Sequence, residues 1–234
     1  GREMKKILIA TLLSFGLITS AGAIGANIGV SLSVGNLEAD NASENFTGAH
    51  SSSARPGDVK KQASAEGDEV EGQFAQGSIF IEASLGDRFS IGLDYVPQDI
   101  ESETTENITN IANGKEVAAQ ATNTVQVDFT DLYTVYAKIN LNENVYFKLG
   151  HVQVDVITNE ALATGGGYGN GDLTGTTVAL GYQHNFNSNM FARVEGFQTE
   201  MDGITLTNTT DSTKSVSADG VDLMGMTLSL GIGF

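Results

Sequence analysis

The sequence predicts an all-β protein: an eight-stranded antiparallel up-and-down transmembrane β-barrel with short periplasmic turns and long extracellular loops. Three observations favour this fold class. Apolar residues alternate with polar or small residues, with a period of two, in segments along the whole chain. Connections between these segments are alternately short and long. After residue 23, no apolar run approaches the roughly 18 residues that indicate a transmembrane helix.

The last segment shows the alternation most clearly. One face carries Met224, Met226, Leu228, Leu230, Ile232 and Phe234, and the other carries Gly225, Thr227, Ser229, Gly231 and Gly233. The first segment alternates in the same way, with Ile28, Val30, Leu32 and Val34 against Gly29, Ser31, Ser33 and Gly35. Strands with one apolar face and one small or polar face suit a barrel wall between lipid and lumen.

Six further strands are expected between these two. They cover approximately 77–85, 88–96, 125–140, 144–156, 174–185 and 189–201. Most reach the roughly 9–11 residues that a tilted strand needs to cross the bilayer. The short connections are 86–87, 141–143 and 186–188, and the long ones are 38–76, 97–124, 157–173 and 202–220. An even strand count puts both ends at the short-turn side, and a closed sheet leaves no unpaired edge in lipid.

Charged residues decide which face is the lumen. Segments 140–148 and 185–193 are weak internal copies and place Lys148 and Arg193 at equivalent positions. A cation facing lipid at mid-bilayer costs roughly 2–4 kcal/mol, so this face is expected inside. The lumen is then expected to hold Glu82, Asp94, Lys138, Lys148, Arg193 and Glu195. We expect a structural network of opposite charges, because unpaired buried ions are costly; an ion path or gate is the functional alternative.

The lipid face is predicted to carry aromatic side chains, several of them in girdles at the strand ends. These are Phe89, Tyr95, Phe129, Tyr133, Tyr182 and Phe234. Beyond Gly150 the apolar residues change parity, to Val152, Val154 and Val156. A β-bulge near Gly150 and His151 accounts for the change, and so does continuation of the strand above the membrane.

The N-terminus has the features of a cleaved signal peptide. A positive pair at 5–6 precedes an apolar stretch at 7–18 and small residues at 21–23. Residues 1–23 are therefore predicted to be a leader, whose first three residues precede the natural start, and residues 24–234 the barrel. Without Arg2, Glu3, Lys5 and Lys6, the chain has 28 acidic and 9 basic residues and a net charge of −19.

Composition excludes several kinds of site. A chain this acidic lacks the basic surface that nucleic-acid binding needs. Cysteine is absent, which excludes disulfides and thiolate zinc sites. Only three histidines are present, and His50 beside a serine run lacks the third group of a hydrolase triad. No catalytic residue, metal site or cofactor is therefore expected, and the chain is not expected to be an enzyme.

These residues also carry a family resemblance. The leader ending at 21–23, the segment 189–196 and the terminal strand resemble small outer-membrane barrel proteins of the OmpA/OmpX type. The pattern covers nearly all of 26–234 and says little about activity. The resemblance implies an outer-membrane location, with outer-membrane lipid, lipopolysaccharide and the assembly machinery as partners. The terminal strand is similar to the signal that this machinery reads, carried here by Leu228, Leu230, Ile232 and Phe234.

The long connections give the functional hypotheses. Segments 38–76 and 97–117 are rich in Asp and Glu and favour flexible, solvated loops. We expect a monomeric surface protein, adhesive or cation-binding, with a narrow or transient channel as the alternative and a lipid-modifying enzyme as a weaker one. The glycine-rich segment 165–171 lacks the lysine and helix of a phosphate loop, and a mobile loop is expected. A soluble exported barrel of the lipocalin kind remains a rival fold, because alternation alone does not tell which face points inward.

Overall fold

A computed structural model gives the arrangement of the strands. It describes residues 24–41, 43–46, 70–102, 104–113, 116–162, 166–187, 189–210, 212 and 214–234. The predicted leader lies outside these residues. No helix within them is long and apolar enough to cross a membrane.

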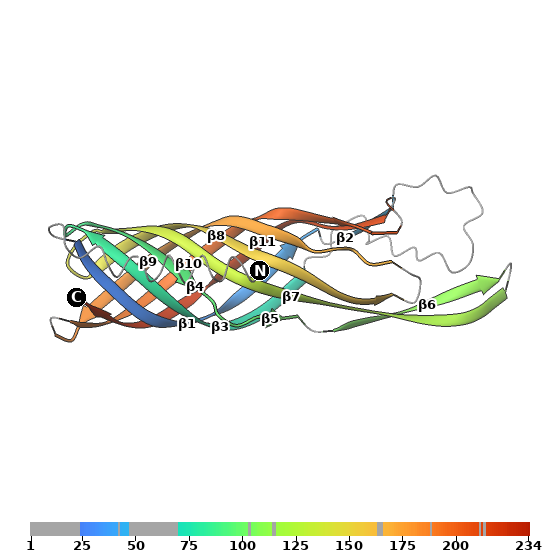
Figure 1. Cartoon of the computed structure of the whole chain (residues 1–234), viewed down its shortest axis with the longest axis horizontal. Helices are drawn as coiled ribbons and strands as arrows, with labels where there is room; N and C mark the ends of the chain where they lie inside the picture. The colour runs from blue at the N-terminus through green and yellow to red at the C-terminus, as the bar shows by residue number, and fades with distance from the viewer. Residues whose placement is uncertain are drawn as a thin grey trace.

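Eight strands form one closed antiparallel sheet, as predicted (Figure 1). Each pairs with the next in sequence, and the last pairs with the first. They are β1 (Ile24–Asp40), β3 (Val70–Leu85), β4 (Phe89–Tyr95), β7 (Glu116–Asn140), β8 (Val145–Leu162), β9 (Gly171–Asn185), β10 (Met190–Thr207) and β11 (Lys214–Gly233). Three further strands extend this barrel: β2 (Ser43–Phe46) pairs with β11, while β5 (Ile100–Glu101) and β6 (Thr105–Asn113) pair with β7.

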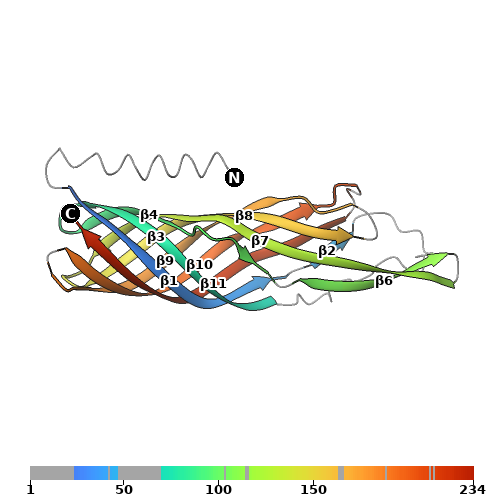
Figure 2. The same cartoon turned by 60° about the horizontal axis from the view of Figure 1, so that its bottom comes forward.

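The strand register fixes the tilt of the barrel. A row of paired residues that starts at Ile28 on β1 crosses the other seven strands and returns to β1 at Glu38. The ladder therefore climbs ten residues in one circuit. Such a stagger requires strands tilted by roughly 35–45° to the barrel axis. Figures 1 and 2 show this tilt, with the tight turns at one end and the long β6–β7 hairpin projecting at the other.

An apolar belt surrounds the half of the barrel next to the tight turns. The outward residues of β1 and β11 are large, apolar and exposed; Val30 is 56% exposed and Leu228 59%. Exposed apolar residues on the other strands complete the belt, among them Ile79, Ile91, Val135, Leu149 and Leu180. A soluble barrel would turn these residues inward. The outward apolar face therefore contradicts the lipocalin-like alternative and identifies a membrane-spanning wall.

Beyond the belt the arrangement reverses: apolar residues lie on the inner face of the barrel and polar residues on the outer face. On β8 the inward residues change from Lys148 to Val152 and Val154, while the outward residues change from Leu149 to His151. The inward apolar residues of this half form one packed core: Val152, Val154, Val156, Leu173, Met201 and Val221, with Leu37, Val127, Phe129, Leu132 and Leu223 against it. The barrel thus continues above the membrane with a water-soluble exterior and an apolar interior.

The parity change beyond Gly150 comes from this continuation. Gly150 pairs in register with both Tyr136 and Thr177, so β8 has no bulge there. The register shift lies on the neighbouring strand β7, between Thr130 and Tyr133. Two residues, Asp131 and Leu132, lie between them and face the single Val154 of β8, so β7 has one extra residue there. Asp131 has a φ of 53° at this bulge.

The bulge corrects one predicted side chain. Inward residues of β7 have even numbers from Lys138 to Leu132 and odd numbers beyond the bulge. Phe129 therefore packs against the apolar core, and its predicted position on the lipid face is wrong. The predicted outward positions of Phe89, Tyr182 and Phe234 are confirmed by exposed fractions of 52%, 47% and 71%.

The long connections are shorter than predicted. β8 runs on to Leu162 and β9 begins at Gly171, so most of the predicted loop 157–173 is strand. The predicted loop 97–124 contains β5, β6 and the first part of β7. The predicted loops 38–76 and 202–220 lose residues to strands in the same way. The three tight turns are confirmed, and in the first of them Gly86 takes a φ of 73°.

Candidate functional site

The lumen of the membrane half is the candidate site. Glu82 on β3, Asp94 on β4, Lys138 on β7, Lys148 on β8, and Arg193 and Glu195 on β10 all point inward. Strand alternation places all six in the lumen, because each lies on the small or polar face of its strand. Five of them join in two ionic clusters, and Asp94 lies apart in the wall of a cavity.

The first cluster is built around Glu82, whose side chain is completely buried. Its Oε1 accepts from Lys138 Nζ at 2.6 Å, Arg193 Nη2 at 3.0 Å and Asn27 Nδ2 at 3.0 Å. Its Oε2 accepts from Arg193 Nη1 at 3.0 Å and Tyr136 Oη at 3.2 Å. Two cations thus share one anion, and the Arg193 fork is bidentate, which gives charge-assisted bonds their best geometry.

The second cluster joins Lys148 to Glu195. Lys148 Nζ donates to Glu195 Oε2, and Tyr146 Oη donates to Glu195 Oε1 at 2.6 Å. The Lys148 ammonium also lies 5.1 Å from the ring centroid of Tyr136, within the range of a cation–π interaction. Tyr136 also donates to Glu82 of the first cluster. It therefore contacts both clusters and connects them into one layer across the lumen.

Glycines make room for the two tyrosines. A Cβ on Gly92 would lie 2.3 Å from the ring of Tyr136, and a Cβ on Gly181 would lie 2.2 Å from the ring of Tyr146. Each ring therefore lies flat over a glycine on the neighbouring strand. These pairings were not predicted from the sequence. The signal was available, because an inward glycine beside an inward aromatic on the next strand indicates such a contact.

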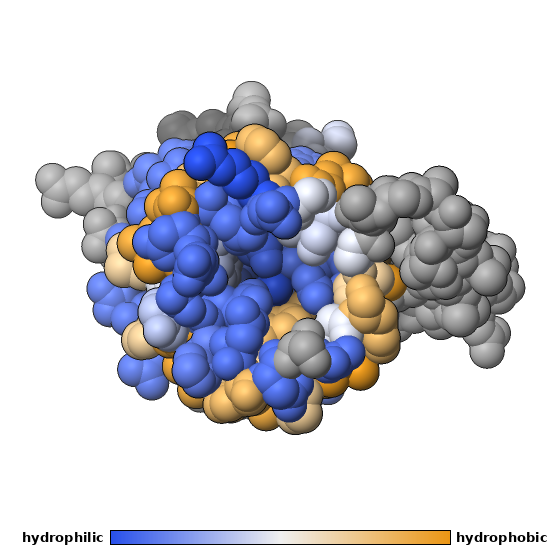
Figure 3. All heavy atoms as spheres, turned by 90° about the vertical axis from the view of Figure 1, so that its left-hand side faces the viewer, coloured by the Kyte–Doolittle hydropathy of each residue, from blue (hydrophilic) through white to orange (hydrophobic). Residues whose placement is uncertain are grey.

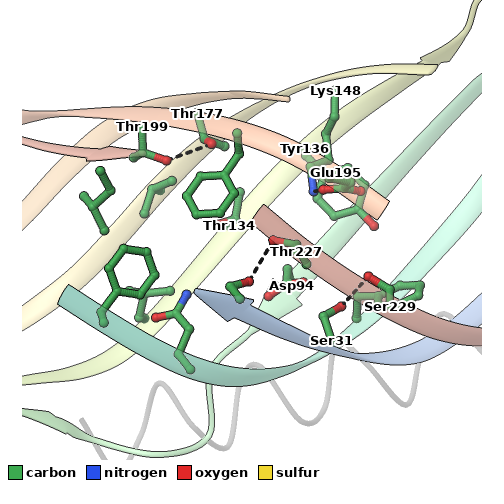
Figure 4. A pocket seen from close by; sticks show the side chains of 18 of the residues that line it. Ser31, Asp94, Thr134, Tyr136, Lys148, Thr177, Glu195, Thr199, Thr227 and Ser229 are labelled. Carbon is green, nitrogen blue, oxygen red and sulfur yellow. Dashed lines mark hydrogen bonds and ion pairs between the residues drawn. The ribbon is translucent and has the colours of Figure 1, made fainter. Parts of the chain in front are cut away.

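A small cavity of about 80 Å³ lies above the ionic layer (Figure 4). Hydroxyl pairs cross its walls: Ser31 with Ser229 at 2.9 Å, and Thr199 with Thr177 at 2.8 Å. Asp94 lies in the wall, beside Ser78 and in the field of Lys148. One water needs roughly 10–15 Å³ of such space, so the cavity has room for a few waters and is not a wide aqueous path.

The lumen opens toward the tight turns as a polar vestibule of about 540 Å³. Figure 3 looks into this end and shows a hydrophilic hollow inside a rim that carries apolar residues. Its lining is rich in asparagine, including Asn27, Asn140, Asn144 and Asn189, and it ends on Lys138 and Tyr146 of the ionic layer. The layer thus separates the vestibule from the cavity above.

The apolar core fills the other end of the lumen, and the β8–β9 loop at this end is held by hydrogen bonds. Tyr168 is buried, and its backbone N–H donates to Glu160 Oε1 at 2.8 Å. The carbonyl oxygen of Gly167 accepts from the backbone N–H of Thr209 at 2.7 Å. Residues 166–170 of the glycine-rich segment are thus hydrogen-bonded both to the end of β8 and to the β10–β11 connection.

The terminal strand presents its predicted recognition residues outward. Leu228, Leu230, Ile232 and Phe234 are between 43% and 71% exposed. Phe234 closes the barrel, since its N–H donates to the Ala26 carbonyl oxygen at 2.9 Å and the Ala26 N–H donates back at 3.3 Å. Recognition by the assembly machinery stays a prediction. Within the part of the chain that the structure describes, no group of three His, Asp or Glu residues is arranged to hold a metal ion.

Comparison with protein-family models and with curated proteins gives no match. Solved structures with a similar fold include the attachment invasion locus protein Ail of Yersinia pestis in complex with the heparin analogue sucrose octasulfate. Identity to it is 10%, over 89% of this chain and 99% of that one, with a TM-score of 0.36. The outer membrane protein OprG of Pseudomonas aeruginosa is 13% identical over 90% and 96%, with a TM-score of 0.39. The outer membrane protease OmpT of Escherichia coli is 11% identical over 92% and 97%, with a TM-score of 0.32.

Likeness at this level concerns architecture only. The class of the protein follows from its own geometry: a closed eight-stranded barrel, an apolar outer belt and a polar, ion-paired interior. This combination is the architecture of Gram-negative outer-membrane barrels. The chain is an outer-membrane β-barrel protein with its tight turns toward the periplasm.

Proposed function

We propose that the protein is a non-conducting surface barrel whose function resides in the part above the membrane. The observation that carries this proposal is the obstruction of the lumen. A layer of buried ion pairs crosses the membrane half, and a packed apolar core fills the other half. Hydrated ions would have to pass both. Eight strands leave an interior just wide enough to be filled by side chains, which supports the same conclusion.

The outer face above the belt supports a role at the cell surface. Glu71, Glu38, Asp222 and Glu200 lie directly opposite one another on four successive strands. Like charges at directly opposite positions repel each other, so this row favours counter-ions or a cationic partner. Lipopolysaccharide carries phosphates, and its contact with this face would require divalent cations between the two. Adhesion to a cationic partner and cation-mediated packing of lipopolysaccharide are therefore the activities we assign to this surface.

A planar bilayer tests the proposal. The reconstituted protein is expected to give no steady conductance in symmetric salt. Stepwise conductance that persists through a recording would contradict the proposal and favour the channel. A matched measurement compares lipopolysaccharide binding in Mg²⁺ and in EDTA. Binding that needs Mg²⁺ and weakens in the Glu38→Gln, Asp222→Asn, Glu200→Gln variant supports the surface assignment, and binding insensitive to both opposes it.

A narrow or transient channel is the second candidate. The vestibule and the cavity favour it, because they leave one ionic layer and one apolar core as the obstacles along the axis. Brief openings that increase when Glu82 is replaced by Gln would support this candidate. An enzymatic role has no supporting side-chain arrangement in the described lumen.

A further inference from the structure

We infer that the periplasmic vestibule is a binding site for a small polyamine, a flexible molecule with two or more ammonium groups. The site is accessible from one side only. It opens at the tight-turn end (Figure 3), and the ionic layer and the apolar core close the lumen behind it. A ligand there would neither cross the barrel nor meet the cell surface.

Three asparagines of the lining already use their side-chain hydrogen-bond donors within the protein. Asn140 Nδ2 donates to the Asp87 carbonyl oxygen at 2.8 Å, and Asn144 Nδ2 donates to the Gln183 carbonyl oxygen at 3.0 Å. Asn27 Nδ2 donates to Glu82 Oε1 at 3.0 Å. These bonds tie neighbouring turns and strands together, so the amide groups are held in fixed positions.

The acceptors of the same side chains remain available. The Oδ1 atoms of Asn27, Asn140 and Asn144 have no hydrogen-bond partner among the described residues. An amide oxygen accepts up to two hydrogen bonds, and an ammonium group has three donors and no acceptor. A ligand whose polar groups only donate hydrogen bonds therefore complements this lining. A sugar fits less well, because each of its hydroxyl groups also carries an acceptor.

The charge of the vestibule lining favours a positively charged ligand over a neutral hydrogen-bond donor. Asp87 and Glu143, which carry two carboxylates, also line the vestibule. At its floor Lys138 and Arg193 share the single carboxylate of Glu82, which leaves one positive charge in that cluster. The two acidic residues exceed this charge by one, so the lining as a whole is negative. No set of three acidic or histidine side chains in the described chain would hold a metal ion, which favours an organic cation.

The two internal copies of the sequence give the vestibule its amides. Each tight turn contains the pattern Asn-x-Asn-x-Asn, at 140–144 and at 185–189. The central asparagine of each copy closes its own turn: Asn142 Oδ1 accepts from the backbone N–H of Asn144 and Val145, and Asn187 Oδ1 accepts in the same way. The four outer asparagines of the two copies line the vestibule, and Asn187 lines it as well.

Calorimetry on the refolded full chain in detergent micelles tests the inference, with spermidine as the probe. Spermidine is expected to bind at one site per chain. The Asp87→Asn, Glu143→Gln variant is expected to weaken this binding by at least about tenfold, since charge-assisted hydrogen bonds are lost. Failure of the variant to fold would appear as loss of its heat-dependent gel mobility. In that case Asn144→Leu, which keeps both charges, replaces it and is expected to weaken binding severalfold.

A matched control separates a site from general attraction to an acidic protein. Asp172→Asn with Asp202→Asn removes the same charge from the outer face of the other end, at two exposed residues outside the acidic row, and binding should not change. Equal weakening in this control would overturn the inference, as would unchanged binding in the Asp87 and Glu143 variant. Absence of binding at millimolar spermidine would overturn it as well. Binding of Ca²⁺ in place of spermidine, lost in the same variant, would reject the assignment to ammonium groups.

Discussion

Replacement of Glu82 by Gln removes a charge from the centre of the lumen and keeps the size of the side chain. Lys138 and Arg193 then lose their shared anion, and both are almost fully buried, with side-chain exposures of 5% and 3%. Removing one partner of a buried ion pair costs roughly 3–5 kcal/mol, because the remaining charge is uncompensated. The amide oxygen of the new side chain still accepts up to two hydrogen bonds from the donors that faced the carboxylate, so we expect the lower half of this range.

Urea unfolding in lipid vesicles measures this cost. The folded fraction is read from gel mobility without heating, and Glu82→Gln should lower the free energy of unfolding by about 3 kcal/mol. Glu200→Gln is the matched control: it removes the same charge on the exposed outer face and should cost less than about 0.5 kcal/mol. Replacing Lys138 by Met and Arg193 by Leu in the Glu82→Leu background should restore most of the stability, since no unpaired ion remains. A cost below about 1 kcal/mol for Glu82→Gln would refute the buried layer.

Three further results are expected. Leu228→Arg puts a cation in the apolar belt and should destabilise folding into lipid by about 2–4 kcal/mol, measured by the same urea titration. Gly181→Val forces Tyr146 off its neighbouring strand and should cost about 1–3 kcal/mol, with the ring displacement visible in near-ultraviolet circular dichroism. Burial, and then the charge of Asp131, raise the pKa of Asp155 above its ordinary value of 3.8, so the folded chain binds this proton more tightly than the unfolded chain. Stability from this group is therefore lost as the pH rises through the raised pKa, and Asp155→Asn should reduce the difference in unfolding free energy between pH 4 and pH 7.

Much of the membrane half followed from the sequence. Period-two alternation placed the strands, and the cost of a cation in lipid placed Lys148 and Arg193 inside. Every inward position then followed from strand parity, which is why six charged residues were expected in one lumen. Their pairing needs more than parity. The strand register climbs ten residues in one turn around the barrel, and this stagger brings Glu82 level with Lys138 and Arg193. The stagger is not visible in any single segment of the sequence.

The part above the membrane escaped prediction for a physical reason. Water surrounds it, so its apolar residues point inward, and the rule that places apolar residues outward reverses there. Val152 and Val154 were noticed for this change of parity, but the sequence left a bulge and a strand continuation as equal explanations. Phe129 was misplaced because the bulge at Asp131 adds one residue on β7 without a glycine to mark it.

The barrel wall faces lipid in one half and encloses an apolar core in the other. Single tryptophans test it directly, because the chain has no native tryptophan. Leu228→Trp reports from the belt and Phe129→Trp from the core, each in vesicles with and without lipids brominated along their acyl chains. We expect strong quenching of the tryptophan at 228, and blue-shifted emission without quenching at 129. Equal quenching at both positions, or none at 228, would contradict this arrangement.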